Sequence, residues 1–197
     1  MISAKGSVKG GFKLARAVII LAKGFEELEA VAVVDVLRRA QIEVVIAGLN
    51  NDYVESARGV KVIPDESIDN IKAENFDMVI LPGGIPGTDN LNADSRVRDL
   101  LIDFASEGRL TGAICAAPSV LANAGLLEGK KVTSYPTYKD KLGKVIYQED
   151  KVVVDGNVLT SRGPATAICF GLAIVEKLSG REKAEEIKKA MLVDYCD

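Results

Sequence analysis

The chain contains no histidine and no tryptophan among its 197 residues. Without histidine, a Ser-His or Cys-His catalytic pair and the commonest zinc ligand sets are excluded, and we expect no metal site. No apolar run approaches the roughly 20 residues that a membrane span requires. The net charge of −3 gives no indication of nucleic-acid binding. The sequence therefore predicts neither a membrane nor a nucleic-acid partner.

Cysteine is also scarce, with one residue each at positions 115, 169 and 196. The count is odd and no Cys-x-x-Cys pair occurs, which favours a reducing compartment, the cytoplasm, over a disulfide scaffold. Cys169 lies in an apolar helical stretch and is expected in the core. Cys196 is expected to be exposed near the C-terminus. We expect neither of these two cysteines to be catalytic.

Acidic residues are absent from residues 1–15, which carry three lysines. We interpret this segment as a disordered leader, with a mitochondrial-type presequence as the alternative. Residues 16–197 show no internal repeat, low-complexity tract or linker. Their length suits one domain with a sizeable core, and a single domain is the prediction.

Short apolar runs alternate with helical patterns along this domain. Such alternation predicts an α/β fold in which a mostly parallel sheet is covered by helices on both faces. The expected strands are residues 16–22, 43–47, 60–63, 78–81, 110–114, 131–134 and 158–160, with a hairpin over 145–154. The expected helices are residues 26–40, 94–106, 116–125, 164–178 and 181–190.

Cys115 lies at the corner between a predicted strand and a predicted helix. The backbone N–H groups at a helix start are unpaired and favour negative charge, so we expect this thiol to ionise more easily than a free cysteine. Ligands bind beyond the carboxyl ends of the strands in open parallel sheets. Cys115 is therefore a candidate nucleophile, and the alternative is a small buried hydrophobe.

Two further sequence features are candidates for a role in the site. Leu81-Pro82-Gly83-Gly84 directly follows a strand, and paired glycines bring N–H donors close to a ligand. Glu29 precedes three apolar residues at helical spacing, which puts its carboxyl group on the buried face of its helix. A buried carboxyl group must protonate or find a donor. Glu29 is thus either a site residue or a structural carboxyl bonded to backbone.

Four separated segments together resemble one family. They are residues 21–29 (Leu-Ala-Lys-Gly-Phe-Glu-Glu-Leu-Glu), 81–84 (Leu-Pro-Gly-Gly), 113–118 (Ala-Ile-Cys-Ala-Ala-Pro) and 160–164 (Thr-Ser-Arg-Gly-Pro). In this order they are similar to the ThiJ/PfpI superfamily and, within it, to its parkinsonism-associated branch, the DJ-one proteins. The resemblance runs from about Arg16 into the C-terminal region.

The resemblance implies a flavodoxin-like three-layer α/β sandwich. It implies that Cys115 is the reactive, oxidation-sensitive nucleophile, and that Glu29 is a protonated carboxyl group that donates to the sulfur and shuttles a proton. It implies that the backbone N–H groups of Gly84 and Ala116 form an oxyanion pocket.

The same resemblance implies a homodimer with Arg39 and Arg58 near its interface, close to the site. The implied activity is a glyoxalase-type conversion of methylglyoxal, a 2-oxoaldehyde, to lactate without a cofactor, together with deglycation of glycated protein. The alternative is a redox-sensing chaperone in the oxidative-stress response, whose cysteine oxidises to a sulfinate without physiological turnover. Both alternatives require the same reactive thiol.

One position departs from the family pattern. Members carry Thr-Thr-His-Pro where this chain has Thr-Ser-Tyr-Pro at residues 133–136. Tyr135 is a poor base near neutrality because the pKa of a tyrosine is about 10. It is either a substrate contact or a packing aromatic. Proton transfer must fall to Glu29, Tyr135, water or the substrate, and Cys-His protease chemistry is excluded.

Overall fold

The computed structural model describes residues 14–50 and 52–196, and the strands of its central sheet run in the order β10-β11-β7-β6-β1-β2-β5. All pairs are parallel except β10 with β11. The bounds are β1 (Arg16–Leu21), β2 (Glu43–Gly48), β5 (Glu66–Ser67), β6 (Met78–Leu81), β7 (Leu110–Ile114), β10 (Val152–Asp155) and β11 (Val158–Ser161). The order β2-β1-β6-β7-β11 is the flavodoxin-like arrangement, with its switch point between β1 and β6.

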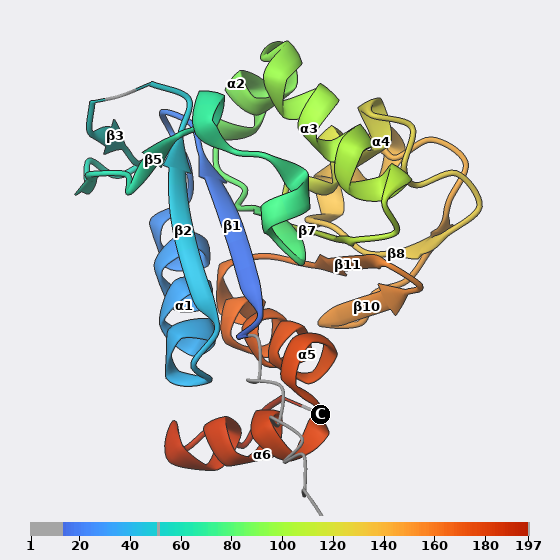
Figure 1. Ribbon diagram of the computed structural model, residues 1–197. Helices are drawn as coiled ribbons and strands as arrows, with labels where there is room; N and C mark the ends of the chain where they lie inside the picture. Colours follow the sequence, from blue (N-terminus) through green and yellow to red (C-terminus); the bar gives the residue numbers. More distant parts are fainter. Residues whose placement is uncertain (1–13, 51, 197) are drawn as a thin grey trace, which may run out of the picture.

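Helices cover both faces of this sheet (Figure 1). On one face, α1 (Glu27–Arg39) packs against α5 (Ala167–Ser179), and α6 (Arg181–Ala190) packs against α5. On the other face lie α2 (Gly87–Ala93), α3 (Ser95–Ser106) and α4 (Pro118–Asn123). The predicted parallel sheet covered on both faces is thus confirmed.

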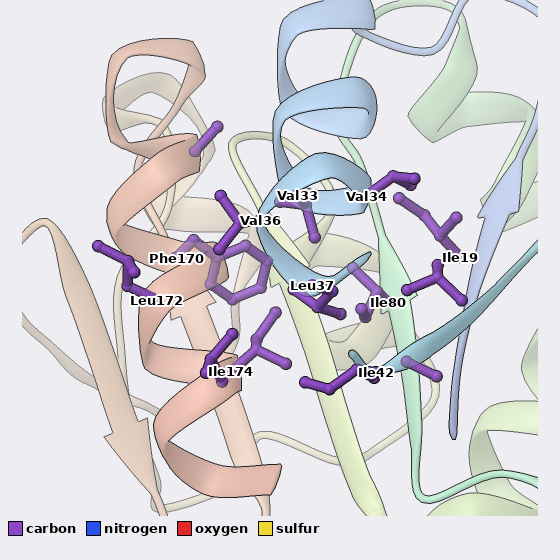
Figure 2. Packing of buried hydrophobic residues seen from close by; sticks show 14 of the residues in the cluster. Ile19, Val33, Val34, Val36, Leu37, Ile42, Ile80, Phe170, Leu172 and Ile174 are labelled. Atoms are coloured by element: carbon purple, nitrogen blue, oxygen red, sulfur yellow. The ribbon is translucent and has the colours of Figure 1, made fainter. Parts of the chain in front are cut away.

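Each face of the sheet has its own apolar core. In the core between α1 and α5, Val36 faces Phe170, and Leu37 and Ile80 lie beneath them (Figure 2). The two helices approach closely because Gly171 has no side chain: a Cβ there would lie 2.9 Å from Val36 Cβ. This packing buries the inner face of α1, from which one site residue projects.

Short elements complete the chain. Two-stranded pairs form between β3 (Val54–Glu55) and β4 (Lys61–Val62), and between β8 (Lys131–Val132) and β9 (Ile146–Tyr147). Within residues 14–50 and 52–196, four 3-10 helices, η1 to η4, cover Ile68–Asn70, Ala73–Asn75, Pro136–Lys141 and Pro164–Thr166. Among the described residues, no helix has both the length and the apolar character that crossing a membrane would take.

Two expectations are wrong, and a third concerns residues that lie mostly outside the described part of the chain. The hairpin expected over residues 145–154 is wrong, because β9 pairs in parallel with β8, and β10 forms its hairpin with β11 through Asp155-Gly156. Cys196 is buried and forms a disulfide with Cys169, whose Cα lies 5.2 Å away. Residues 1–13 of the expected leader lie outside the described residues.

Candidate active site

The carboxyl ends of three neighbouring strands bring the predicted site residues together. β1, β6 and β7 are adjacent and parallel, so the segments that follow them meet at one edge of the sheet. Glu29 lies in the first turn of α1 after β1, the Gly83-Gly84 pair follows β6, and Cys115 follows β7. Segments far apart in the sequence thus converge on one small volume.

The backbone holds Cys115 in an uncommon conformation. Its φ is 63°, in the left-handed region that residues other than glycine seldom adopt. Its N–H donates to the carbonyl oxygen of Ser161 at 3.0 Å, and its own carbonyl accepts from the N–H of Tyr135 at 2.8 Å. These bonds fix the residue at the sharp turn between β7 and α4, the type of corner that presents a nucleophile.

Gly83 allows the close approach of the two reactive side chains. A Cβ at this position would lie 2.7 Å from Cys115 Cβ and 2.9 Å from Glu29 Oε2, so no larger residue fits without displacing one of them. Gly84 has a φ of 94°, and a Cβ there would lie 2.4 Å from the backbone nitrogen of Glu26. Both glycines are therefore required by the geometry of the site.

Glu29 is fully buried, as its place on the apolar stripe of α1 predicts. Its Oε2 accepts the Gly83 N–H at 2.7 Å, and among the described residues its Oε1 has no hydrogen-bond partner. Burial raises the pKa of Glu29 from 4.5 to about 7, although the Gly83 N–H and the Cys115 thiol oppose the rise. The carboxyl group therefore exchanges its proton near neutral pH.

Cys115 is the free cysteine of the described part of the chain, and it is half-buried. Burial raises the pKa of its thiol, and the charge and hydrogen bonding of Glu29 raise it further. The N–H groups of Ala116 and Gly84 lower it by hydrogen-bonding to the sulfur, but they do not compensate. The expectation of an easily ionised thiol is thus wrong, because burial disfavours the thiolate and the buried carboxylate beside it opposes a second negative charge.

The two acids therefore behave as a pair that loses its first proton near pH 7 and keeps one proton above that pH. The proton can reside on the sulfur with Glu29 ionised, or on Glu29 with Cys115 as a thiolate, and both forms carry the same net charge. The amides of Ala116 and Gly84 favour the second form because they donate to a charged sulfur. This arrangement can move a proton between a nucleophile and a bound molecule.

Glu26 is an acidic neighbour of the pair at the start of the same helix. It is the N-cap of α1, is buried, and accepts the Glu29 N–H through Oε2 at 2.9 Å. Its Oε1 lies 4.0 Å from the exposed guanidinium of Arg58. Glu26 therefore orients the helix turn that carries Glu29 and connects it to Arg58.

The tyrosine at position 135 lies beside the site with its ring against the Ser-Arg-Gly-Pro segment. A Cβ at Gly163 would be 3.5 Å from Tyr135 Cδ2. Tyr138 was missed by sequence reasoning; burial and the charges of Asp89 and Cys115 raise the pKa of its phenol. Tyr138 lies in η3, three residues after Tyr135. Residues i and i+3 share a face of a 3-10 helix, so this spacing was the available signal that Tyr138 lies near the site.

Arg39, the other arginine expected near the site, instead forms an ion pair with Asp35 at 2.7 Å on the exposed side of α1. Its expected place at a dimer interface stays a prediction. Among residues 14–50 and 52–196, no group of three or more cysteine, aspartate and glutamate side chains is arranged to hold a metal ion.

The fold agrees with the comparisons with known proteins. Residues 15–177 match the model of the DJ-1/PfpI family. The chain is 48% identical over 182 residues to protein dj-1beta of Drosophila melanogaster, which covers 91% of this chain and 97% of that protein. The chain therefore belongs to the DJ-1/PfpI family.

Two further proteins are similar to this chain. The crystal structure of Drosophila melanogaster DJ-1beta superposes with a TM-score of 0.89 at 47% identity, covering 93% of this chain and 100% of that one. A Caenorhabditis elegans protein named glutathione-independent glyoxalase DJR-1.2 is 39% identical over 168 residues, or 84% of this chain and 89% of that protein.

Proposed function

We propose that this protein is a cysteine-dependent glyoxalase that converts methylglyoxal or a similar 2-oxoaldehyde to the 2-hydroxy acid without a cofactor. The observation that carries the proposal is the pair of Cys115 and the fully buried Glu29, whose pKa is raised to about 7 by burial. The name of the Caenorhabditis elegans relative supports the same reaction class.

The first step is attack of the Cys115 sulfur on the aldehyde carbon. Glu29 accepts the thiol proton as the carbon–sulfur bond forms, and a base with a pKa near the working pH is well matched to this transfer. The aldehyde oxygen becomes an oxyanion, for which the N–H groups of Gly84 and Ala116 are the proposed donors. Glu29 then delivers the thiol proton to this oxyanion, which yields a hemithioacetal and restores the Glu29 carboxylate.

The second step is an internal redistribution of electrons that needs no external oxidant. Glu29 removes the hydrogen from the former aldehyde carbon as a proton, and the electron pair moves toward the neighbouring ketone carbon through an enediol. Return of a proton to that carbon yields a thioester of the 2-hydroxy acid. Water then attacks the thioester, releasing the acid and restoring the Cys115 thiol.

Turnover of methylglyoxal by the wild type and by Cys115→Ala and Glu29→Gln variants tests the proposal. Both variants should lose at least about a hundredfold in kcat/KM, in line with loss of a nucleophile or a general base. Glu182→Gln, in the exposed first turn of α6, is the matched control and should retain full activity. Equal rates in all four proteins would refute the proposal.

The fate of one hydrogen tests the role of Glu29 directly. In deuterated water, a proton carried by Glu29 exchanges with solvent, so lactate should contain deuterium at the carbon bearing its hydroxyl group. Full retention of the substrate hydrogen there would indicate a direct hydride shift and would contradict a shuttle through Glu29.

The other activities that the resemblance implies rest on the same thiol. We propose protein deglycation as an extension of the substrate range, and a homodimer as the assembly. A redox role is favoured by Cys115 being the free thiol of the described residues, with N–H donors beside its sulfur. Mass spectrometry after mild peroxide decides it: a sulfinate on Cys115 supports the role, and unmodified Cys115 contradicts it.

A further inference from the structure

A second sulfur-containing site lies at α5, outside the active site. Cys169, in the first turns of α5, is bonded to Cys196 near the end of the chain. Both cysteines line a pocket of about 530 Å³ between α5, α6 and the segment before β10. Charged side chains at the same pocket include Glu149, Arg181 and Glu185. The pocket gives a small reagent a route to an otherwise buried bond.

Residues 192–196, here called the tail, are held to the rest of the protein by the disulfide and by non-covalent contacts. The carbonyl oxygen of Tyr195 accepts from Lys151 Nζ at 2.5 Å, and that of Cys196 accepts from Lys188 Nζ. Leu192 is 90% exposed, so it adds little apolar contact. Without the disulfide, the ordering entropy of this segment is opposed by the two lysine–carbonyl bonds, by the buried Val193, and by the bonds that the backbone N–H groups of Leu192 and Val193 donate to α6.

Lys151 also connects the tail to the end of β11, next to the active site. Its carbonyl oxygen accepts from Ser161 Oγ at 2.7 Å, and the Ser161 carbonyl accepts the Cys115 N–H at 3.0 Å. Ser161 Oγ lies 2.7 Å from Thr166 Oγ1, three residues before Cys169. The Cys196 side of the disulfide is therefore connected through Lys151, and the Cys169 side through Thr166, to the hydrogen bonds that hold the backbone of Cys115.

We propose that the Cys169–Cys196 disulfide is a redox-reversible clasp, opened by a dithiol reductant that enters the pocket, and that its opening releases the tail and loosens the backbone around Cys115. This inference goes beyond the proposed glyoxalase activity and does not depend on it.

The chemistry is thiol–disulfide exchange. A thiolate of the dithiol attacks one Sγ of the pair, the Sγ–Sγ bond breaks, and the other cysteine leaves as a thiolate that takes a proton from water. The second thiol of the reductant loses its proton and attacks the mixed disulfide. This releases the remaining cysteine and closes the reductant to its own disulfide. Two electrons pass from the dithiol to the cysteine pair.

Treatment of the folded wild-type protein with dithiothreitol tests the clasp without any variant. After removal of the reductant and alkylation with iodoacetamide, mass spectrometry should find Cys169 and Cys196 modified, with no denaturant needed. Hydrogen–deuterium exchange of the tail should then rise at least tenfold. A bond that opens only in denaturant would overturn the proposal, and so would an open bond with unchanged exchange in the tail.

Two variants separate the disulfide from the hydrogen bonds. Cys196→Ser should reproduce the exchange of the reduced wild type, whereas Lys188→Met, which removes one lysine–carbonyl bond and keeps the disulfide, should stay close to the oxidised protein. Rapid tail exchange in oxidised Lys188→Met would show that the disulfide is not the main attachment and would overturn the clasp.

The rate at which iodoacetamide modifies Cys115 tests the connection to the active site. Reduction should increase this rate at least threefold, because a looser end of β11 exposes the half-buried thiol. An unchanged rate would overturn the connection. Activity toward methylglyoxal is not needed for any of these measurements, so failure of the clasp and failure of the glyoxalase proposal are distinguishable.

Discussion

Replacement of Glu29 by glutamine should stabilise the protein at pH 8 and change its stability little at pH 5. The pKa of Glu29 is raised in the folded state to about 7, whereas the unfolded value is 4.5. A raised pKa means that the folded state holds the proton more tightly than the unfolded state. The stability that this proton adds to the folded state is fully present below pH 4.5 and is lost as the pH rises through 7. Glutamine is neutral throughout and avoids that loss.

The magnitude follows from the two pKa values. Between pH 5 and pH 8, ionisation of Glu29 should reduce the free energy of unfolding of the wild type by about 2.5 kcal/mol, a loss that the glutamine variant escapes. The Gly83 N–H, which donates to Oε2, retains an amide oxygen as its acceptor. The lowered pKa values of Asp69 and Asp94 affect stability near pH 3.8 and below, outside this range.

Urea unfolding at pH 5, 6, 7 and 8 measures the effect. With a slope of about 2 kcal/mol per molar urea, the amount by which the midpoint of the variant exceeds that of the wild type should grow by roughly 1.2 M between pH 5 and pH 8. Glu182→Gln is exposed and should follow the wild type at every pH. Parallel curves for the wild type and Glu29→Gln from pH 5 to pH 8 would refute the reasoning, because they would show that burial does not raise the pKa of Glu29.

Three further substitutions have expected outcomes. Gly83→Ala should cost about 1–3 kcal/mol in urea unfolding and most of the methylglyoxal turnover, because the new Cβ overlaps Cys115 and Glu29; a stable, active variant would contradict the close approach. Asp94→Ala should cost about 1 kcal/mol because Asp94 caps α3 through a backbone N–H, and an unchanged Tm would contradict this. Tyr135→Phe keeps the ring and should change kcat/KM by less than about threefold, whereas a tenfold loss would show that the hydroxyl group takes part.

Much of the site was predictable because local periodicity and strand order carry the necessary information. The spacing of apolar residues after Glu29 placed its carboxyl group on the buried face of α1, and burial there is complete. The parallel sheet placed Cys115 and the glycine pair at one edge, because the carboxyl ends of parallel strands meet there. These inferences need no knowledge of contacts between distant segments.

The remaining features depend on contacts that the sequence pattern does not encode. The return of the tail to α5 brings Cys196 to Cys169 across 27 residues of chain, and nothing in the local pattern of either cysteine indicates this. The ionisation of Cys115 depends on its burial and on the charge of Glu29, which is distant in sequence, so the helix-start argument alone predicted the wrong direction. The requirement for glycine at position 83 follows only from the two side chains that lie beside it.

The pH dependence of catalysis should be set by the same ionisation of Glu29 that costs stability. The form with a Cys115 thiol and a Glu29 carboxylate and the form with a thiolate and a neutral carboxyl contain the same number of protons, so a pH profile reports the pair. In the proposed reaction, kcat/KM of the wild type should therefore rise as the pH increases through about 7, where the pair loses its first proton.

Glu29→Gln should be more stable than the wild type at pH 8 and yet have little activity and no rise near pH 7. A buried acid that lowers stability at the pH where it acts is expected at a functional site, since a purely structural position would gain from the neutral side chain. A Glu29→Gln variant that was both more stable and fully active would break this connection between the buried charge and the chemistry.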